Sequence, residues 1–416
     1  MPEAVPRSSW QAGAEELTLA TQLPREIDVA VIGGGVAGTI AALRLSRAGR
    51  TVLLLEREGI AAGASGRNGG FLPLGTALSY PELVTRLGRE KARQIWALTL
   101  ENREVVRRLI REERIVCDFR EPGHLELALS DGALPVLARR QALLVADGFP
   151  AELLGPARVQ ALVDLPLGPR VAGGFLTPDG GLMDTARFVS GVARAAAMAG
   201  TQLARATVHA IQPDGGSLRI HTGGGVVQAA AAVVCINAWT HQLLPMLTGL
   251  VTPVRGQVLA TAPLPPAFRC GMIAQVTPTE EYWQQTPAGS IVLGGCRAVR
   301  PDRDVGTDDM TPSTDVQIAL DRVLPWLFPS LPKLEVTHRW AGLMAFTPDR
   351  LPILDRVPGL PGAWMLSACS GHGMSLIPRL AELVADAAMG LPLPPLAPSL
   401  GLDRPGLVVA PPTGSR

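Results

Sequence analysis

The chain has 416 residues, of which 47% are hydrophobic and 18% are charged, so it can bury a sizeable core and is not a disordered chain. This length exceeds what one compact core usually organises, and two domains are therefore expected. The 38 basic and 37 acidic residues give a formal net charge of +1, which argues against a nucleic acid or an anionic membrane surface as a partner.

The N-terminus and the cysteines indicate a cytoplasmic protein. Residues 1–24 form a polar, proline-containing leader that we expect on the surface, without the basic and apolar regions of a signal peptide. No apolar run reaches the roughly 18–20 residues of a membrane span. The five cysteines include no C-x-x-C pair, which favours a reducing compartment and argues against a disulfide framework or a zinc site. No metal is expected.

Residues 29–56 have the pattern of a βαβ unit that binds a dinucleotide. A β-branched run at 29–32, a glycine turn, an Ala/Leu-rich helix at 39–50 and an apolar run that ends in Glu56 follow one another. A carboxylate at the end of the second strand can accept hydrogen bonds from both hydroxyls of a ribose. The unit is therefore predicted to hold a nucleotide.

The glycine turn reads G-x-G-x-x-G, with glycines at 33, 35 and 38. Gly33 permits the tight turn, Gly35 lets the backbone approach a pyrophosphate, and Gly38 lets the helix pack closely on the strand. Val36 and Ala37 begin the helix, whose N-terminus presents free N–H groups and a partial positive charge to the phosphates.

A second glycine-rich segment, residues 57–71, follows Glu56 directly. It is too rich in glycine for a helix or a strand, and it carries Ser65, Arg67 and Asn68 with almost no apolar anchor. A surface loop can have this composition. A loop just after the ribose-binding acid nevertheless lies near the cofactor, where small residues let backbone N–H groups reach phosphates or a ring, and we prefer this interpretation.

These two segments resemble the FAD-dependent amine and amino-acid oxidoreductases of the D-amino-acid oxidase superfamily, in particular the glycine oxidase-like and gamma-glutamylputrescine oxidase-like members. The resemblance extends from about residue 25 to 390. It implies an α/β fold (α+β overall) with a Rossmann-like FAD-binding domain and an interleaved substrate domain of antiparallel sheet plus helices. The expected ranges are 25–79, 172–245 and 335–390 for the FAD-binding domain, 80–171 and 246–334 for the substrate domain, 1–24 for the leader and 391–416 for a Pro-rich tail.

The resemblance also implies which residues contact FAD. The expected set is Gly33, Gly35, Val36, Ala37, Gly38, Glu56, Arg57, Ala64, Ser65, Arg67, Asn68, Gly69, Gly70, Val208, Asn237, Ala238, Trp239, Gly342, Gly371, His372, Gly373 and Met374. NAD as the sole cofactor is disfavoured, because the loop after Glu56 and the C-terminal Gly-His-Gly turn suit a flavin.

The first excursion from the nucleotide-binding unit predicts helices over residues 81–115, a strand within 119–129 and further helix over 133–165. Charged residues in the first of these segments are expected on a solvated face. His124 lies in the strand, and we interpret it as a hydrogen-bonded structural histidine rather than a catalytic base.

The next segment returns to the nucleotide-binding domain. Asp184 is a predicted N-cap for a helix at 185–199, and a strand begins at about Thr207. In the family the backbone of a valine on this strand recognises the adenine, which implies Val208, although a plain core valine is an equal alternative. Asn237 stands where the family usually has glycine, and asparagine tolerates a positive φ better than most residues.

Four alternating segments, at 254–261, 272–276, 280–285 and 290–295, predict a strand-rich sheet. The resemblance implies that its side chains roof the substrate pocket. Tyr282 either lines that pocket or packs in the core, and both alternatives are open. A helix is expected at 313–328.

The C-terminal blocks are the most family-like part of the chain. Gly371-His372-Gly373 is a glycine turn that leads into a helix at about 375–389. The helix N-terminus and His372 are expected to face the flavin edge that becomes negative on reduction. His372 and Tyr282 are therefore the candidate catalytic residues. The Pro-rich residues after 390 are predicted to form an exposed tail.

Two departures from the family bear on the substrate. Glycine oxidase-like members carry an arginine at the position of Met344, and sarcosine oxidases carry a lysine at the position of Ser375 and a flavin-linked cysteine near Met344. This chain has none of the three, so FAD is predicted to be non-covalent. The substrate is then a more apolar amine, or an acid held by another arginine such as Arg255 or Arg297. Met344, Tyr282 and Arg255 are the candidate substrate contacts.

Three functions follow from this interpretation. The first is an FAD-dependent oxidase that converts an amine or amino acid to an imine and passes electrons to dioxygen. The second is an FAD dehydrogenase with a quinone or another protein as acceptor. The third is a non-catalytic FAD-binding subunit. The sequence contains no pair of acids or histidines that stands out as a catalytic dyad, in keeping with hydride transfer from a neutral amine.

Overall fold

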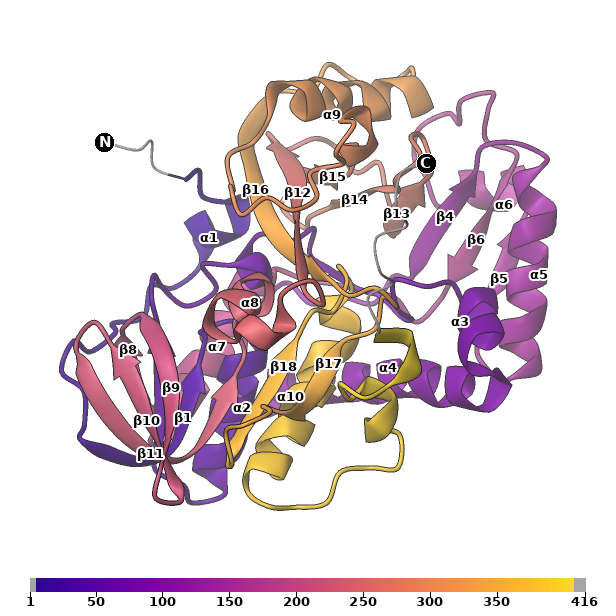
Figure 1. Cartoon of the computed structure of the whole chain (residues 1–416). Coiled ribbons are helices and arrows are strands. Elements are labelled where there is room, and N and C mark those ends of the chain that lie inside the picture. The colour runs from indigo at the N-terminus through magenta and orange to yellow at the C-terminus, as the bar shows by residue number, and fades with distance from the viewer. Residues whose placement is uncertain (1–4, 408–416) are drawn as a thin grey trace, which may run out of the picture.

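A computed structural model describes residues 5–407, which form two eight-stranded sheets and the helices around them (Figure 1). The first sheet contains, in spatial order, β17 (Ile353–Arg356), β18 (Ala363–Ser367), β11 (Gly225–Val234), β1 (Glu26–Ile32), β2 (Val52–Glu56) and β8 (Gln202–Arg205). β10 (Ser217–Thr222) also pairs with β11, and β9 (Val208–Asp214) pairs with β10. Strands β18, β11, β1, β2 and β8 are parallel. This is the expected Rossmann-like sheet.

The second sheet is largely antiparallel. It contains, in spatial order, β16 (Val336–Phe346), β12 (Thr252–Thr261), β15 (Ile291–Gly294), β14 (Glu281–Gln285), β13 (Gly271–Ala274), β4 (His124–Ala128), β6 (Gly173–Thr177) and β5 (Glu152–Leu154). Only β13 and β4 pair in parallel within it. A separate short pair joins β3 (Phe71–Leu72) to β7 (Gly181–Leu182).

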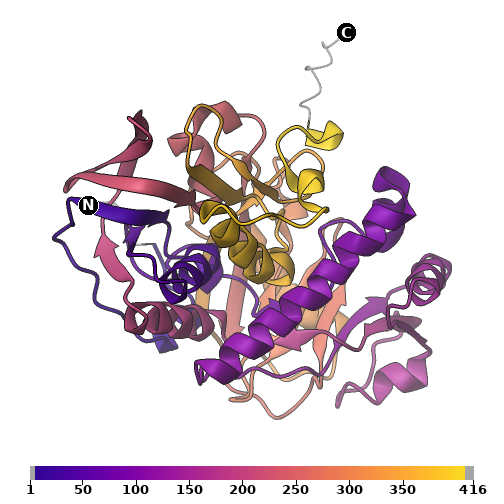
Figure 2. The same ribbon diagram turned by 90° about the horizontal axis from the view of Figure 1, so that it is seen from below.

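The helices cover these sheets and connect them. They are α1 (Ser9–Gly13), α2 (Val36–Arg47), α3 (Tyr80–Leu87), α4 (Arg89–Glu112), α5 (Ala133–Ala146), α6 (Pro156–Gln160), α7 (Thr185–Met198), α8 (Thr240–Leu243), α9 (Thr314–Leu327) and α10 (Gly373–Ala388). Helix α2 packs between α7 and α10. Seen from below, the long α4 runs diagonally across the molecule beside α10 (Figure 2).

The core of the first sheet follows from its sequence. The strands β1 and β2 are buried on both faces, as expected of continuous apolar runs in a parallel sheet. Leu53 and Leu54 are fully buried, and each contributes about 2 kcal/mol relative to an exposed side chain. Helix α7 begins where predicted, because the Asp184 carboxylate accepts a hydrogen bond from the backbone N–H of Arg187.

The sequence interpretation is wrong in part about both ends of the described chain. Most described residues of the leader are exposed, as predicted, but Ser8 is buried and caps the first helix, in which Trp10 and Gln11 are also buried. The residues after 390 are not simply an exposed tail, because Leu400 and Arg404 are buried, and the guanidinium of Arg404 forms an ion pair with Asp349. Residues 1–4 of the leader and 408–416 of the tail lie outside the described residues.

The expected fold class is confirmed. The segment at 133–165 differs in that it contains β5 between two helices. The division into domains stays a prediction. The second sheet includes β6 and β16, although both lie in ranges that we expected to belong to the FAD-binding domain. β16 belongs to this sheet because it pairs with β12 along almost its whole length. None of the helices in residues 5–407 is long and apolar enough to cross a membrane.

Candidate active site

A cavity of about 940 Å³ extends from the C-terminal ends of β1 and β2 to the second sheet. Most of the predicted site residues lie in its wall. These are Gly33, Gly35, Val36, Ala37, Glu56, Arg57, Ala64, Ser65, Arg67, Asn68, Gly69, Val208, Asn237, Trp239, Tyr282, Gly342, Met344, Gly371, His372, Gly373 and Met374. Segments from widely separated parts of the sequence thus meet at one site.

Three predicted cofactor contacts do not line the cavity and act through packing instead. A Cβ atom on Gly38 would overlap the carbonyl oxygen of Gly33, so glycine is required for α2 to approach β1. Gly70 has φ +78°, and a Cβ atom there would lie 2.5 Å from the carbonyl oxygen of Met183. Ala238 is the middle residue of the turn at 237–239, and it is buried.

The first glycine turn forms an open cradle at the start of α2. Gly33 has φ +111°, and a Cβ atom there would lie 2.6 Å from the carbonyl oxygen of Cys235. Gly35 is the N-cap residue and provides no side-chain cap. The backbone N–H of Val36 donates to the hydroxyl of Ser65 over 2.9 Å. The first helical turn and the second glycine segment therefore meet where the helix dipole favours an anion.

The Glu56 carboxylate is fixed beside this cradle. It accepts hydrogen bonds from the backbone N–H groups of Gly34 at 2.7 Å and Glu58 at 2.8 Å. Each oxygen retains acceptor capacity, because a carboxylate oxygen accepts more than one hydrogen bond. The geometry is that expected of an acid that binds ribose hydroxyls.

One end of the cavity is bounded by Val208, Arg57 and Trp239. The Arg57 guanidinium lies 4.3 Å from the centroid of a Trp239 ring, a cation–π contact. Asn237 begins the turn before Trp239 with φ +45°, as the sequence predicts for the residue that replaces glycine. Its backbone oxygen accepts hydrogen bonds from Thr240 and Ser367, which fix the turn.

The second glycine segment is held by an element that sequence analysis missed, the N-terminal leader. The Trp10 indole donates to the backbone oxygen of Asn68 at 2.7 Å, and the Gln11 amide donates to the backbone oxygen of Ala61 at 2.9 Å. The buried guanidinium of Arg67 donates to backbone oxygens of Pro6 and Ala341. Arg67 and Asn68 thus fix the segment. A signal was present, because Ser8 and Gln11 form the capping box of α1.

His372 lies at the N-cap of α10, in the cavity wall. Its Nδ1 atom is buried and has no hydrogen-bond partner among residues 5–407. Burial lowers the pKa of His372, which favours the neutral imidazole. A buried polar atom without a partner indicates that a ligand group completes the site.

Tyr282 lies deeper, in a narrow slot between two glycines. Cβ atoms on Gly69 and Gly294 would each lie 2.5 Å from the tyrosine side chain. The ring of Phe71 contacts it edge-on, with 5.7 Å between centroids. Burial raises the pKa of Tyr282 to about 12, so the phenol is protonated at neutral pH. Tyr282 lines the cavity, and its predicted catalytic and substrate roles stay predictions.

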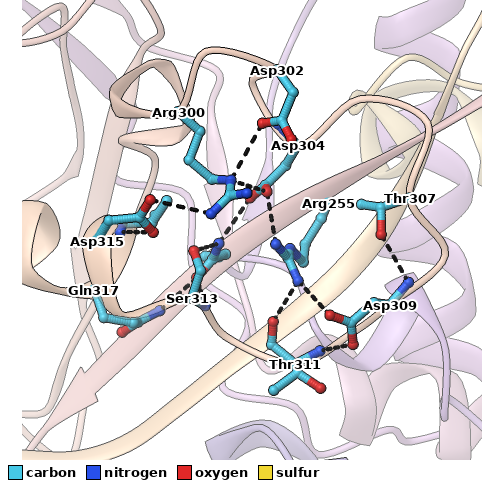
Figure 3. A network of polar contacts seen from close by, with 12 residues as sticks. Arg255, Arg300, Asp302, Asp304, Thr307, Asp309, Thr311, Ser313, Asp315 and Gln317 are labelled. Carbon is cyan, nitrogen blue, oxygen red and sulfur yellow. Dashed lines mark hydrogen bonds and ion pairs between the residues drawn. The ribbon is translucent and has the colours of Figure 1, made fainter.

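The prediction that Arg255 contacts substrate is wrong. Arg255 does not line the cavity; its guanidinium forms ion pairs with Asp304 at 2.8 Å and Asp309 at 2.7 Å and donates to the backbone oxygen of Thr311 (Figure 3). Both terminal nitrogens of its guanidinium are therefore already paired within the protein. The other candidate, Arg297, does line the cavity, as does Met344.

His124 is structural, as expected. It is buried, and its Nε2 lies 2.9 Å from the backbone oxygen of Gly181. Burial lowers the pKa of His124 to about 4, which keeps the ring neutral.

Comparison with known proteins identifies the family. The family model described as FAD dependent oxidoreductase (DAO) matches residues 28–387. The chain belongs to this family. It is therefore an FAD-dependent oxidoreductase, and the resemblance found in the sequence is confirmed.

Curated relatives cover most of the chain. A probable oxidoreductase, OrdL, of Rhizobium meliloti is 29% identical over 92% of this chain and 89% of its own length. The gamma-glutamylputrescine oxidoreductase of Escherichia coli is 28% identical over 87% of this chain and 84% of its own length. The glycine oxidase of Geobacillus kaustophilus is 26% identical over 86% of this chain and 92% of its own length.

Solved structures share the fold. The crystal structure of glycine oxidase from Geobacillus kaustophilus has a TM-score of 0.78 at 23% identity and covers 92% of this chain and 99% of its own. That of L-proline dehydrogenase from P. horikoshii has a TM-score of 0.74 at 22% identity and covers 90% of this chain and 96% of its own.

The residues of the site fit FAD. The Gly33–Ala37 cradle suits the pyrophosphate, and the fixed Glu56 carboxylate suits a ribose. At the other end of the cofactor path, the unpartnered Nδ1 of His372 and the start of α10 suit a flavin edge that carries hydrogen-bonding atoms. The cavity is continuous between these points, as an extended dinucleotide requires.

Proposed function

We propose that this protein oxidises the C–N bond of an amine or amino acid to an imine. Bound FAD would supply the hydride acceptor at N5, and dioxygen would take the electrons afterwards. The observation that supports this proposal is a single cavity, which joins the dinucleotide cradle to a deeper end lined by Tyr282, Arg297 and Met344. The named activities of the relatives, on glycine and gamma-glutamylputrescine, support the C–N class.

The protein's contribution is to bind and orient rather than to transfer protons. Tyr282 is protonated and held in its slot, so it can donate a hydrogen bond but is a poor base. His372 is neutral and lies at the positive end of α10, where both the helix dipole and an N–H donor favour developing negative charge. We propose that these two residues position the substrate and stabilise the reduced state.

The substrate amine must be neutral before it can lose hydride. Arg297, Arg303 and Arg350 all line the cavity, and nearby positive charge disfavours the ammonium form of a bound amine. The arginines therefore favour the reactive protonation state without a dedicated base. Cys369 also lines the cavity, but burial raises the pKa of its thiol to about 11. A protonated thiol is a poor nucleophile, and we propose that FAD is held non-covalently.

The first test is anaerobic mixing of the FAD-loaded protein with a panel of amines and amino acids, monitored by visible absorbance. Bleaching of the flavin band by one substrate, with recovery in air, is expected for an oxidase. Release of FAD into the supernatant after acid precipitation is expected for a non-covalent cofactor. Flavin that stays with the precipitate would contradict that assignment.

An FAD dehydrogenase that uses a quinone or a protein acceptor is the alternative. The fold comparison with L-proline dehydrogenase motivates it, since the same architecture supports that activity. Flavin that bleaches but does not recover in air would favour this alternative. A second alternative, a non-catalytic FAD-binding subunit, predicts that no amine bleaches the flavin at all.

A further inference from the structure

The deeper end of the cavity carries arginines that have no acidic partner in the described chain. Arg297 is half-buried in the wall, and among residues 5–407 its guanidinium takes part in no ion pair or side-chain hydrogen bond; it lies 5.5 Å from the Phe346 ring centroid. A cation withdrawn from water is costly unless a counter-ion completes it. The described chain provides no such counter-ion for Arg297, so the site is suited to an anionic ligand.

Neighbouring residues strengthen the positive field at this point. The Arg350 guanidinium lies 4.9 Å from the centroid of Phe346, so two cations contact one ring. Arg303 also lines the cavity and contributes its charge. Burial lowers the pKa of Arg297, and the charges of Arg350 and Arg303 lower it further. A bound anion would relieve this mutual repulsion.

Among residues 5–407, the acidic side chains of the same wall form no ion pair with Arg297, Arg303 or Arg350. Glu82 is engaged in the capping box of α3, where its carboxylate accepts from the backbone and hydroxyl of Ser79. Glu280 also lines the cavity, but it is exposed to solvent, which screens its charge. Arg86 adds a further positive charge at the rim. The balance of charge at this end favours an anionic ligand.

The segment that presents Arg297 is rigidly tied to the second sheet. The buried Asp304 carboxylate accepts hydrogen bonds from Arg255 and Gln257, both on β12, at 2.8 Å each, and it pairs with Arg300 (Figure 3). The backbone N–H of Arg255 donates to the Asp304 oxygen. Arg255 thus serves the site indirectly, by holding the segment. A guanidinium on a fixed segment loses less conformational entropy on binding.

Met344 packs against the His372 turn. A Cβ atom on Gly371 would lie 3.2 Å from the Met344 sulfur, so the thioether packs against that turn. The wall near the turn is consequently apolar, and the half-buried Arg297 lies on a different segment of the wall. An acidic group recognised here would be held by Arg297 rather than by a residue at 344.

We propose that Arg297 binds a carboxylate of the substrate, so that the substrate class is an amine that carries an acidic group. This inference rests on the proposed oxidation of a C–N bond, because it assigns the amine end to the flavin and the acid end to Arg297. The planar guanidinium can hold both carboxylate oxygens, whereas the neutral amide of the same acid offers only one acceptor and no charge.

The test uses the FAD-loaded protein and measures binding by the change in flavin absorbance on titration with acetate and butyrate, and with acetamide and butyramide. We expect the carboxylates to bind and the amides to bind at least tenfold more weakly. In Arg297→Ala the carboxylate Kd should rise at least tenfold, and Arg297→Lys should recover part of the loss. Unaltered FAD content and Tm in Arg297→Lys guard against misfolding.

Arg322→Ala is the matched control, because Arg322 is an exposed residue of α9 and does not line the cavity. Its carboxylate Kd should stay within twofold of wild type. Wild-type affinity in Arg297→Ala, or equal affinity for acids and amides, would overturn the inference. Reduction of the flavin only by amines without an acid would overturn it while leaving the proposed function intact. Carboxylate binding through Arg297 without reduction by any amine would instead refute the proposed function.

Discussion

The Trp10 indole donates a 2.7 Å hydrogen bond to the backbone oxygen of Asn68, 58 residues further along the chain. This bond connects the N-terminal helix to the glycine segment that lines the cofactor end of the cavity. The leader is therefore part of the site's architecture, and its loss should weaken the binding of FAD.

Trp10→Phe should weaken FAD binding about three- to tenfold. The ring stays, but one hydrogen bond is lost and the Asn68 carbonyl is left without that donor, which costs about 1 kcal/mol. The FAD Kd of the apoprotein, measured by quenching of flavin fluorescence, checks this. Trp326→Phe is the control, since Trp326 is exposed on α9. An unchanged Kd in Trp10→Phe would show that the leader does not support the cofactor segment.

Gly38→Ala should disrupt the cradle. Its Cβ atom would overlap the carbonyl oxygen of Gly33, so α2 must move away from β1. Overpacking of this kind costs about 1–3 kcal/mol, and the FAD Kd should rise at least tenfold. Calorimetric titration with FAD measures the effect. Gly155→Ala is the control, because a Cβ atom there meets nothing within 4 Å. Equal affinity in the two variants would contradict the packing argument.

Stability should fall as the pH drops from 7.5 to 5, in part through His124. Its pKa is lowered to about 4 in the folded protein, from the ordinary histidine value of 6.5. Between these values the unfolded chain binds the proton and the folded chain does not, so unfolding is favoured as the pH falls. At pH 5 the contribution is about 2 kcal/mol. Urea unfolding of wild type and His124→Asn at both pH values tests this. An identical pH dependence in the two proteins would contradict it.

The C-terminal segment should contribute to stability through Arg404. Its buried guanidinium pairs with Asp349 at 2.6 Å and donates to the backbone oxygen of Leu400. Arg404→Met leaves the Asp349 carboxylate buried without its partner, a loss of about 3 kcal/mol. The free energy of unfolding in urea checks this. The double variant Arg404→Met/Asp349→Leu should regain part of the stability. A wild-type value for Arg404→Met would indicate that the segment is not anchored.

Local patterns made the nucleotide-binding half predictable. The spacing of Gly33, Gly35 and Gly38 and the acid at Glu56 encode turns and strand ends within one stretch of chain, so the sequence alone indicates their geometry. The positive φ of Asn237 followed in the same way from its residue type and its place after a strand.

Long-range partners were not predictable. The sequence predicts Arg255 as a substrate contact, whereas in the fold it pairs with Asp304, 49 residues away, and no local pattern predicts such a pair. The packing of the leader could not be predicted for the same reason. Its polar composition indicates a surface segment, whereas Trp10 and Gln11 are buried because they dock on backbone groups of a distant loop.

The central claim is that one cavity binds FAD and presents an amine to it. Anaerobic mixing of the FAD-loaded protein with amines that carry a carboxylate, followed by air, tests this most directly. The account predicts that the flavin absorbance near the visible maximum bleaches with at least one such amine and returns in air. A flavin that no amine bleaches, in a protein that binds FAD and is folded, would contradict it.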